Sequence, residues 1–187
     1  MRIIAGEAKG RVLVAPKGGP TRPATDRIRE SLFAMLEPDL PDARVLDLFA
    51  GAGTMGLEAL SRGAAHVTFV ERAAPAIEAL KRNVAATGFR DRADVLNANV
   101  IGVLDLGLSD SYDLAFVDPP FVDVAVLEAT LAHPHFAAAL APGATVIARV
   151  LRKHAPALPR GARLVRTKRI GEEDLLFLRY SDARGGG

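Results

Sequence analysis

The sequence contains no cysteine and no tryptophan, and aromatic residues make up only 5% of it. The absence of cysteine excludes disulfide bonds, zinc sites built on thiolates and a cysteine nucleophile, and it is compatible with a reducing compartment. No apolar run approaches the roughly 20 residues of a membrane span, and the first residues lack the apolar stretch of a signal peptide. We therefore expect a cytoplasmic protein without a metal, whose core consists of alanine, valine, leucine and isoleucine.

The net charge is only +2, but the charges are distributed unevenly along the chain. Residues 1–30 hold seven Lys and Arg against three Asp and Glu, residues 31–148 hold seven against fifteen, and residues 149–171 hold eight against none. An acidic body with basic segments near both ends indicates a docking site for a polyanion where these segments meet. A solvated basic face without a ligand explains the same pattern, so charge alone leaves both interpretations open.

Apolar strands and amphipathic helices alternate from residue 43 onward. The pattern predicts strands at 43–49, 66–71, 92–96, 112–117 and 144–151, and helices at 54–62, 74–87 and 124–133. An earlier helix begins after Thr25, which can cap it, and ends before Pro38. This alternation predicts a doubly wound α/β fold.

Two hairpins flank this alternating region. Residues 2–5 and 11–15 read as a short N-terminal hairpin, and residues 164–169 and 175–180 as a terminal antiparallel one. We divide the chain into an N-terminal hairpin extension (1–24), a Rossmann-like domain (25–181) and a disordered tail (182–187). The expected sheet is seven-stranded and mostly parallel.

The first strand runs into the segment DLFAGAG, residues 47–53. In doubly wound sheets, ligands bind beyond the carboxyl ends of the strands, where the strand order reverses. Gly51 and Gly53 allow a tight turn and a close approach of the backbone to a ligand. Asp47, at the end of an apolar strand, requires a polar partner, either the ammonium group of a methionine moiety or the backbone of the turn.

Gly51, Gly53 and Gly56 also spell the GxGxxG pattern of dinucleotide-binding proteins, and Glu71 follows 20 residues after Gly51. Two features argue against NAD as the ligand. Asp47 places a negative charge near the position of a pyrophosphate, and the chain has little room for the second half-site of a dehydrogenase. We therefore expect an adenosyl ligand that carries an ammonium group.

The second strand, VTFVE, ends at Glu71. A carboxylate at this position can accept hydrogen bonds from both ribose hydroxyls of an adenosine. A surface ion pair of Glu71 with Arg72 or Arg92 is the alternative. Glycine turn and carboxylate together favour the adenosyl site over either alternative.

The fourth strand ends in the tetrapeptide DPPF, residues 118–121. The two prolines remove N–H donors and fix the backbone, so that Asp118 and an adjacent carbonyl can accept the hydrogens of an aromatic amine. Phe121 offers a ring on which a planar base can stack, worth about 1–3 kcal/mol per base. A rigid turn without chemistry is the alternative interpretation.

The motifs DLFAGAG, VTFVE and DPPF, in this order and spacing, resemble the amino-methyltransferase branch of the Rossmann-like methyltransferases. The MRIIAG start and the segments RPATDRIRESLF (22–33) and GLEALSRGA (56–64) resemble, more narrowly, the bacterial small-subunit ribosomal RNA guanine-N2 methyltransferases of the RsmD type. The resemblance covers roughly residues 1–180. DPPF alone is shared with DNA and protein-glutamine methylases, so the narrower resemblance rests on segment 22–33 and on the short chain.

This resemblance implies a class I fold that binds S-adenosylmethionine and methylates the exocyclic N2 amine of a guanine in 16S ribosomal RNA. It assigns cofactor binding to residues at the ends of the first three strands: Asp47, Phe49, Gly51, Gly53, Glu71 and Asn99. It assigns the target base to Asp118, Pro119, Pro120 and Phe121. The chain departs from the family pattern at Asn99, where an Asp is common, at Ala148-Arg149, where an acidic residue is expected, and at Ile170, where an aromatic is usual.

We expect phosphate contacts from cations near the N-terminus, namely Lys9, Arg11, Arg22, Arg27 and Arg29, although an ordinary amphipathic helix also explains residues 25–30. The resemblance implies that the substrate is ribosomal RNA in an assembling small subunit, and a monomer is the default state. A DNA adenine or cytosine amino-methylase, a protein-glutamine methylase and a non-catalytic RNA-binding module remain open as alternatives.

Overall fold

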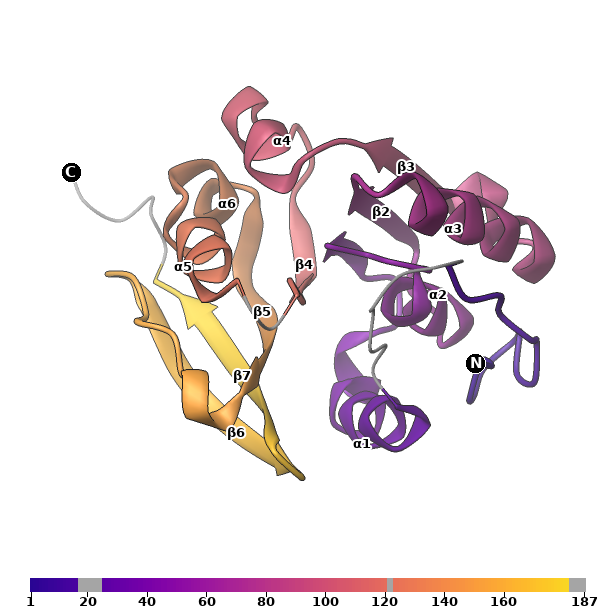
Figure 1. Cartoon of the computed structure of the whole chain (residues 1–187), viewed down its shortest axis with the longest axis horizontal. Coiled ribbons are helices and arrows are strands. Elements are labelled where there is room, and N and C mark those ends of the chain that lie inside the picture. Colours follow the sequence, from indigo (N-terminus) through magenta and orange to yellow (C-terminus); the bar gives the residue numbers. More distant parts are fainter. Residues whose placement is uncertain (17–24, 121–122, 182–187) are drawn as a thin grey trace.

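The computed structural model describes residues 1–16, 25–120 and 123–181, and its centre is a seven-stranded sheet (Figure 1). The strands are β1 (Arg44–Leu48), β2 (His66–Glu71), β3 (Ala93–Asn97), β4 (Tyr112–Val117), β5 (Leu140–Leu151), β6 (Ala162–Ile170) and β7 (Glu173–Tyr180). Their order is β3-β2-β1-β4-β5-β7-β6. The first five strands pair in parallel, and β7 is antiparallel to both β5 and β6. The predicted doubly wound, mostly parallel sheet is confirmed.

Helices cover both faces of the sheet. They are α1 (Asp26–Leu36), α2 (Thr54–Ser61), α3 (Ala74–Thr87), α4 (Val100–Leu106), α5 (Val124–Ala132) and α6 (Pro134–Ala138), with short 3-10 turns η1 (Glu37–Asp39), η2 (Arg90–Arg92) and η3 (Arg152–His154). One apolar cluster joins α1, α2 and α3 to the sheet, and a second cluster joins α4, α5 and α6 to the opposite face. We call these the α1 face and the α5 face of the sheet.

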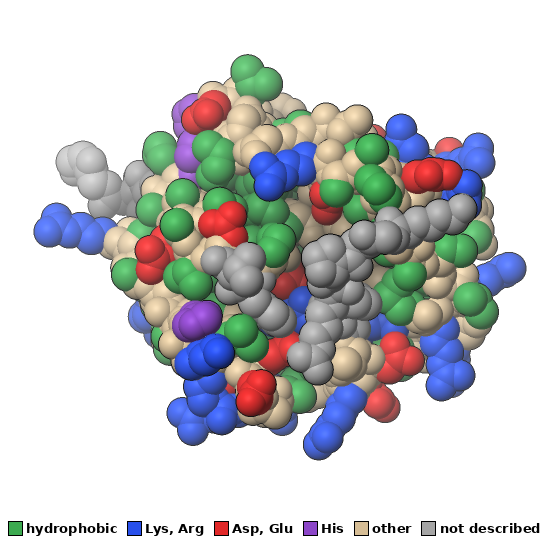
Figure 2. All heavy atoms as spheres, viewed as in Figure 1, with side chains coloured by type: hydrophobic (Ala, Val, Ile, Leu, Met, Phe, Trp, Pro, Cys, Tyr) green, Lys and Arg blue, Asp and Glu red, His purple; other side chains and the backbone are tan. Residues whose placement is uncertain are grey.

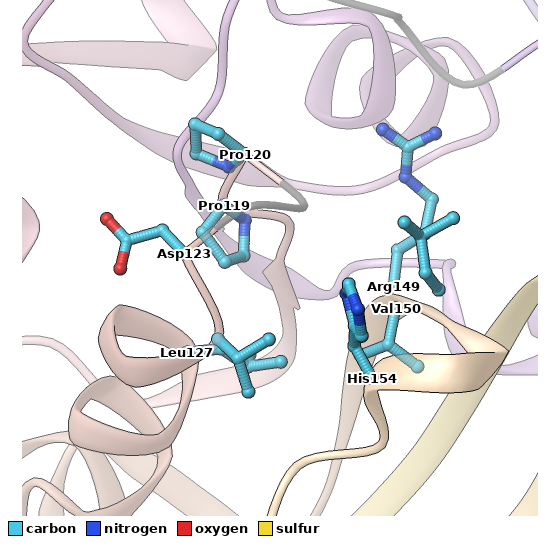
Figure 3. A pocket seen from close by; sticks show the side chains of 9 residues that line it. Pro119, Pro120, Asp123, Leu127, Arg149, Val150 and His154 are labelled. Carbon is cyan, nitrogen blue, oxygen red and sulfur yellow. The ribbon is translucent and has the colours of Figure 1, made fainter.

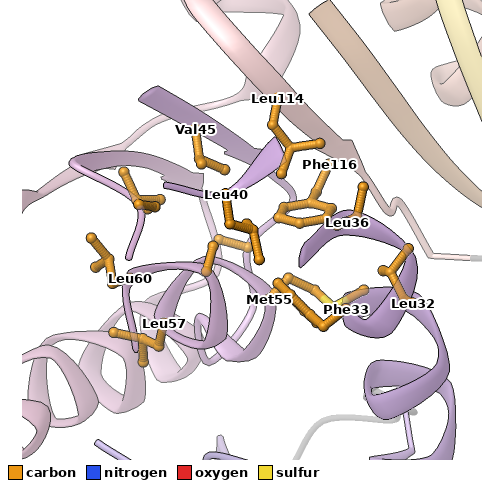
Figure 4. Packing of buried hydrophobic residues seen from close by; sticks show 14 of the residues in the cluster. Leu32, Phe33, Leu36, Leu40, Val45, Met55, Leu57, Leu60, Leu114 and Phe116 are labelled. Atoms are coloured by element: carbon orange, nitrogen blue, oxygen red, sulfur yellow. The ribbon is translucent and has the colours of Figure 1, made fainter. Parts of the chain in front are cut away.

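Helix α1 begins and packs as its sequence predicts. The Thr25 hydroxyl accepts a hydrogen bond from the backbone N–H of Ile28, which satisfies one of the free donors at the helix start. Leu32, Phe33 and Leu36 are fully buried, and the ring of Phe33 lies 5.8 Å from that of Phe116 on β4 (Figure 4). This contact fixes α1 over the centre of the sheet, next to the strand that ends in DPPF.

The N-terminal segment differs from the predicted hairpin. The two arms pair in antiparallel fashion around one bridge, Arg2 to Val12, with backbone hydrogen bonds from Ile3 N–H to the Arg11 carbonyl at 3.0 Å and from Leu13 N–H to the Met1 carbonyl at 2.9 Å. Other backbone groups of the segment bond to helix side chains: the Glu58 carboxylate accepts from two of its N–H groups, at 2.8 and 3.0 Å, and Asn83 accepts from Val14 N–H at 2.8 Å. The pairing is therefore shorter than the predicted strands, because α2 and α3 satisfy part of this backbone.

Strand β5 begins at Leu140, before the residue-144 start that the sequence predicts. Pro142 and Gly143 interrupt the apolar run and read as a loop. In the structure Leu140 already pairs with Tyr112, and the pairing shifts register before Leu114. The irregularity accommodates the proline inside the strand.

The two basic segments of the sequence are only partly separated in the structure. Residues 1–16 lie over α2 and α3, whereas β6 is the outermost strand at the other end of the sheet (Figure 1). Residues 1–16 and β6 therefore do not lie side by side, but α1, which holds residues 26–30, packs in one cluster with β7, and a shared docking site for residues 1–30 and 149–171 stays a prediction. Within the three described ranges, no helix combines the length and apolar character needed to cross a membrane.

Candidate active site

The carboxyl ends of β1, β2 and β4 lie side by side at the point where the strand order reverses. Leu48 on β1 is in register with both Val70 on β2 and Val117 on β4. The sheet therefore brings Glu71 and Asp118 to the two sides of the turn that follows Leu48. Asp47 lies one residue before Leu48, opposite Phe116. Three residues proposed from sequence thus share one edge of the sheet.

The glycine turn after β1 has the backbone of a close-approach site. Gly51 and Gly53 have φ of +57° and +79°, a region that favours glycine, and Phe49 also has a positive φ of +62°. A Cβ on Gly53 would lie 2.3 Å from Leu80 Cδ1, so a larger residue would displace the Leu80 side chain in addition to straining the turn. A Cβ on Gly51 would meet no atom within 4 Å, which leaves open space beside the turn for a ligand.

Asp47 is buried behind this turn. Its Oδ2 accepts a hydrogen bond of 2.9 Å from the backbone N–H of Gly56 in α2, so Asp47 makes the turn-stabilising contact that was the alternative to ligand binding. Burial raises the pKa of Asp47 to about 7; the Gly56 N–H lowers it, and the charges of Asp118 and Glu71 raise it further. An ammonium group near Asp47 would relieve this cost of a buried charge.

Glu71 binds the backbone of two turns. Oε2 accepts from Gly51 N–H at 2.9 Å, and Oε1 accepts from the N–H groups of Arg72 and Ala73 at 2.8 Å each. All three contacts are hydrogen bonds from backbone N–H groups. Arg92, one of the two ion-pair partners that the sequence suggests for Glu71, pairs with Glu7 instead. Glu71 holds the glycine turn beside the start of α3.

Asn99 follows β3 and caps α4. Its Oδ1 accepts hydrogen bonds from Ile101 N–H at 2.9 Å and from Gly102 N–H at 3.4 Å. The sequence suggests a cofactor role for this residue but not the cap. The amide of Asn99 is exposed and follows β3, the strand that pairs with β2 next to Glu71.

Asp118 follows β4 and is held by an arginine. Arg149 Nε donates to Asp118 Oδ1 at 2.8 Å, and Arg149 Nη1 lies 3.3 Å from Glu173 Oε2 on β7. Burial raises the pKa of Asp118, and the charge and hydrogen bond of Arg149 act against this rise. The Arg149 side chain is only 7% exposed.

Arg149 and Glu173 are site residues that sequence reasoning missed. The signal is an arginine inside the apolar strand TVIARV. The family resemblance marks this position only as a departure from the usual pattern. A buried arginine requires carboxylate partners, so its position was itself evidence for a charged site.

The prolines after Asp118 line a hollow between β4 and β5. Pro119 and Pro120 face Val150 and His154 across it, with Leu127 of α5 on the same side as the prolines (Figure 3). Arg149 extends along its rim. Phe121, the proposed stacking residue, lies outside the described residues. The hollow is partly apolar and adjoins the backbone that follows Asp118.

The predicted phosphate-binding cations fall into three groups. Lys9, Arg11 and Arg27 are exposed, and Arg22 lies outside the described residues. The prediction for Arg29 is wrong, because this side chain is fully buried. It bonds to Asp26 at 2.7 Å and to the Arg2 carbonyl at 2.6 Å, and lies 3.7 Å from the Glu58 carboxylate. Its place in α1 next to Ile28 turns it toward the core, where it joins α1 to α2 and to the N-terminal segment.

Comparison with known proteins agrees with this architecture. A family model described as Conserved hypothetical protein 95 matches residues 1–179. Ribosomal RNA small subunit methyltransferase D of Escherichia coli (strain K12) is 44% identical over 121 residues, which are 65% of this chain and 60% of that protein. Its counterpart in Haemophilus influenzae is 38% identical over 123 residues, 65% of this chain and 64% of that protein. These alignments span less than two thirds of the length of either relative.

Solved structures extend the likeness over the whole fold. The methyltransferase yhhF from Escherichia coli is 34% identical, and the alignment covers 96% of this chain and 97% of that one with a TM-score of 0.79. The methyltransferase SMU.776, whose structure contains SAH, shares the fold at 13% identity, with 80% of this chain and 48% of that one covered and a TM-score of 0.65. The match of the family model over residues 1–179 and the 38–44% identity to its curated members show that the chain belongs to the family of the RsmD-type ribosomal RNA methyltransferases.

Proposed function

We propose that the protein transfers the methyl group of S-adenosylmethionine to the exocyclic N2 amine of a guanine in small-subunit ribosomal RNA. The observation that carries this proposal is the convergence of Asp47, Glu71 and Asp118 at one edge of the sheet, in a chain whose relatives are named as ribosomal RNA methyltransferases. A rigid turn without chemistry does not account for a carboxylate at each of these three strand ends.

The residues present fit the cofactor. The open space beside Gly51 admits an adenosyl group, the Glu71 carboxylate can accept from ribose hydroxyls, and the buried Asp47 suits an ammonium group. Phe49 and Gly53 complete the turn, and Asn99 offers an amide near the adenine. When bound, S-adenosylmethionine supplies an electrophilic methyl group on a sulfonium.

The chain's own residues orient and activate the amine. Asp118 Oδ1 is bonded to Arg149, and the carboxylate with the Pro119 carbonyl can accept the two hydrogens of the amine. These hydrogen bonds favour a tetrahedral nitrogen and stabilise the positive charge that develops as the nitrogen–carbon bond forms and the carbon–sulfur bond breaks. The proton then passes to Asp118 or to water. The base reaches the site unstacked, and the aromatic ring of Phe121 replaces a stacking neighbour that the base has lost.

The RNA-facing surface includes the exposed cations Lys9, Arg11 and Arg27, for which we propose phosphate contacts together with Arg22. We further propose that the protein acts in the cytoplasm on an assembling small subunit, because its relatives are named as small-subunit ribosomal RNA methyltransferases. We propose that it acts as a monomer. No metal enters this scheme.

A transfer assay with radiolabelled S-adenosylmethionine tests the proposal. The acceptors are a 16S ribosomal RNA transcript, undermethylated small ribosomal subunits, duplex DNA and total cell protein. We expect label in one of the two RNA samples, recovered as N2-methylguanosine after nuclease digestion, and a rate of labelling at least about a hundredfold lower with the Asp118→Asn variant. Label only in DNA or protein overturns the proposal, and another methylated nucleoside overturns the guanine-N2 assignment alone.

A further inference from the structure

The outermost strand, β6, carries cations that the structure leaves without ion pairs. Arg163, Arg166 and Arg169 are exposed and Lys168 is half-buried, and the strand contains no acidic residue. Within the described ranges, none of the four forms a salt bridge, whereas buried or partly exposed arginines elsewhere are paired with carboxylates, among them Arg44, Arg62, Arg92 and Arg152. Figure 2 shows Lys and Arg side chains along the rim of the molecule where β6 and η3 lie.

A β-bulge places three of these cations on one face. Arg163, Arg166 and Lys168 are in register with Arg179, Phe177 and Leu175, which are alternate residues of β7. Residues opposite each other in neighbouring strands point to the same face. The register shifts between Leu164 and Arg166, so one extra residue realigns Arg163 with the other two.

This face also carries Arg149, the partner of Asp118, whereas the hollow beside the prolines is lined by Leu127 and Val150 of the α5-face cluster. Leu175 is in register with both Lys168 on β6 and Arg149 on β5, and Arg149 bonds to Asp118 at the end of β4. Leu175 and Phe177 belong to the apolar cluster on the α1 face. Three strand spacings of ~4.8 Å put the backbone of Lys168 about 14 Å from the end of β4 along this row.

We propose that Arg163, Arg166, Lys168 and Arg179, the β6 basic strip, bind the sugar-phosphate backbone of the RNA whose base enters the Asp118 site. This inference rests on the proposed function. The row Asp118–Arg149–Leu175–Lys168 gives only the direction from the site to the strip, since Arg149 and Leu175 are buried and the RNA backbone would pass over the residues that cover them. Arginine presents a planar fork of donors to phosphate, and the unpaired cations need lose no protein partner on binding.

Protection of an exposed sheet edge against pairing with other chains is the competing explanation for cations on β6. Edge protection requires charged residues on the edge strand, but these can have either sign and can point to either face. It does not explain the bulge that places Arg163, Arg166 and Lys168 on the α1 face. Substitution by glutamate separates the two explanations, because it keeps the edge charged and reverses its attraction for phosphate.

The test compares two triple variants with equal change of net charge. The first is Arg163→Glu, Arg166→Glu and Lys168→Glu; the control is Lys81→Glu, Arg82→Glu and Arg90→Glu, at exposed positions on α3 and η2. Binding is measured with a fluorescent 20-nucleotide oligouridine at several salt concentrations, and kcat and KM with the ribosomal RNA sample that the wild type methylates. Circular dichroism and gel filtration establish that each variant is folded and unaggregated.

Loss of three phosphate contacts should lower the slope of log Kd against log salt by about 2, since each contact on a single strand contributes ~0.7. We expect KM for RNA to rise about tenfold, equivalent to ~1.4 kcal/mol, with kcat nearly unchanged and the control close to wild type. If the first variant does not fold, Arg166→Gln with Lys168→Gln is measured instead, with an expected slope change of about 1.4.

An unchanged slope and KM in a folded β6 variant would overturn the inference, as would equal losses in the control. A wild-type protein that methylates no RNA contradicts the proposed function instead, whatever the variants do. The two failures are therefore distinguishable.

Discussion

Asp118 and Arg149 form a mostly buried ion pair, with Arg149 Nε 2.8 Å from Asp118 Oδ1, at the ends of the adjacent parallel strands β4 and β5. Glu173 on the antiparallel strand β7 holds the other side of the guanidinium. The network therefore joins Asp118, which follows the parallel strand β4, to the antiparallel strand β7. One oxygen of Asp118 is oriented by the pair, which prepares the carboxylate to accept a hydrogen bond from an incoming amine.

Replacement of Asp118 by asparagine should reduce turnover about 10²–10⁴-fold, the usual contribution of a positioned proton acceptor. Asparagine keeps the size of the side chain but cannot take a proton or stabilise a developing positive charge as well. The measurement is single-turnover methylation of RNA, with calorimetric binding of S-adenosylhomocysteine as the control. Undiminished methylation by the variant would remove Asp118 from the mechanism.

Replacement of Arg149 by methionine should move the acid limb of the pH–rate profile to higher pH. Burial raises the pKa of Asp118 and Arg149 opposes that rise, so without Arg149 the pKa of the carboxyl rises further. Activity that requires ionised Asp118 is then lost at a higher pH as the solution is acidified. The profile of kcat is compared with those of Arg149→Lys, which should lie near the wild type, and of Glu173→Gln. If Arg149 has a purely structural role, activity should be lower at every pH, and the pH at which activity is lost on acidification should not change.

Replacement of Asp47 by asparagine should change how stability depends on pH. The folded-state pKa of Asp47 is about 7, above the ordinary value of 3.8, so the folded protein holds this proton more tightly and its stability falls as pH rises between these values. The loss amounts to at most about 4 kcal/mol for a shift of roughly three units. Asparagine can still accept from Gly56 N–H and has no charge to bury. Urea unfolding at pH 5 and pH 8 should show a smaller decline for the variant; equal declines would contradict the buried, protonatable carboxyl.

Replacement of Arg29 by methionine should destabilise the protein by about 3 kcal/mol, because removing one partner leaves the fully buried Glu58 charge less compensated. The Arg2 carbonyl also loses its donor. The matched control is Arg27→Met at an exposed position of the same helix, for which a change within about 0.5 kcal/mol is expected. Thermal and urea unfolding measure both. If the Arg29→Met variant is as stable as the control, the buried contacts of Arg29 do not stabilise the protein.

Replacement of Gly51 by alanine should weaken cofactor binding beyond its cost to stability. Gly51 and Gly88 both have positive φ, +57° and +82°, and neither has an atom within 4 Å of a built Cβ. Alanine at either position should cost about 1–2 kcal/mol of stability through backbone strain. Only at Gly51 should the Kd for S-adenosylhomocysteine rise, by about tenfold or ~1.4 kcal/mol. Equal binding by the two variants would place the cofactor away from the glycine turn.

The sequence by itself determined the α/β architecture and the order of its elements. Strands and helices differ in apolar period, and glycine and proline mark their ends, so local spacing sufficed for β2, α3 and β4, whose bounds match the predicted ranges. Because parallel strands end at a common edge, the positions of Asp47, Glu71 and Asp118 at the ends of the first, second and fourth strands also predicted that they lie together. The N-terminal hairpin is shorter than its pattern predicts, because side chains of α2 and α3 take part of its backbone hydrogen bonds, and no local pattern contains these partners.

Tertiary structure decided which charges are used and which are buried. Arg27 and Arg29 are two residues apart and chemically identical, yet only packing of α1 against α2 buries Arg29 beside Glu58. The pairing of Arg149 with Asp118 depends on the adjacency of β4 and β5. The common face of Arg163, Arg166 and Lys168 depends on a β-bulge. Register and burial arise from contacts between distant segments, so composition and spacing alone do not specify them.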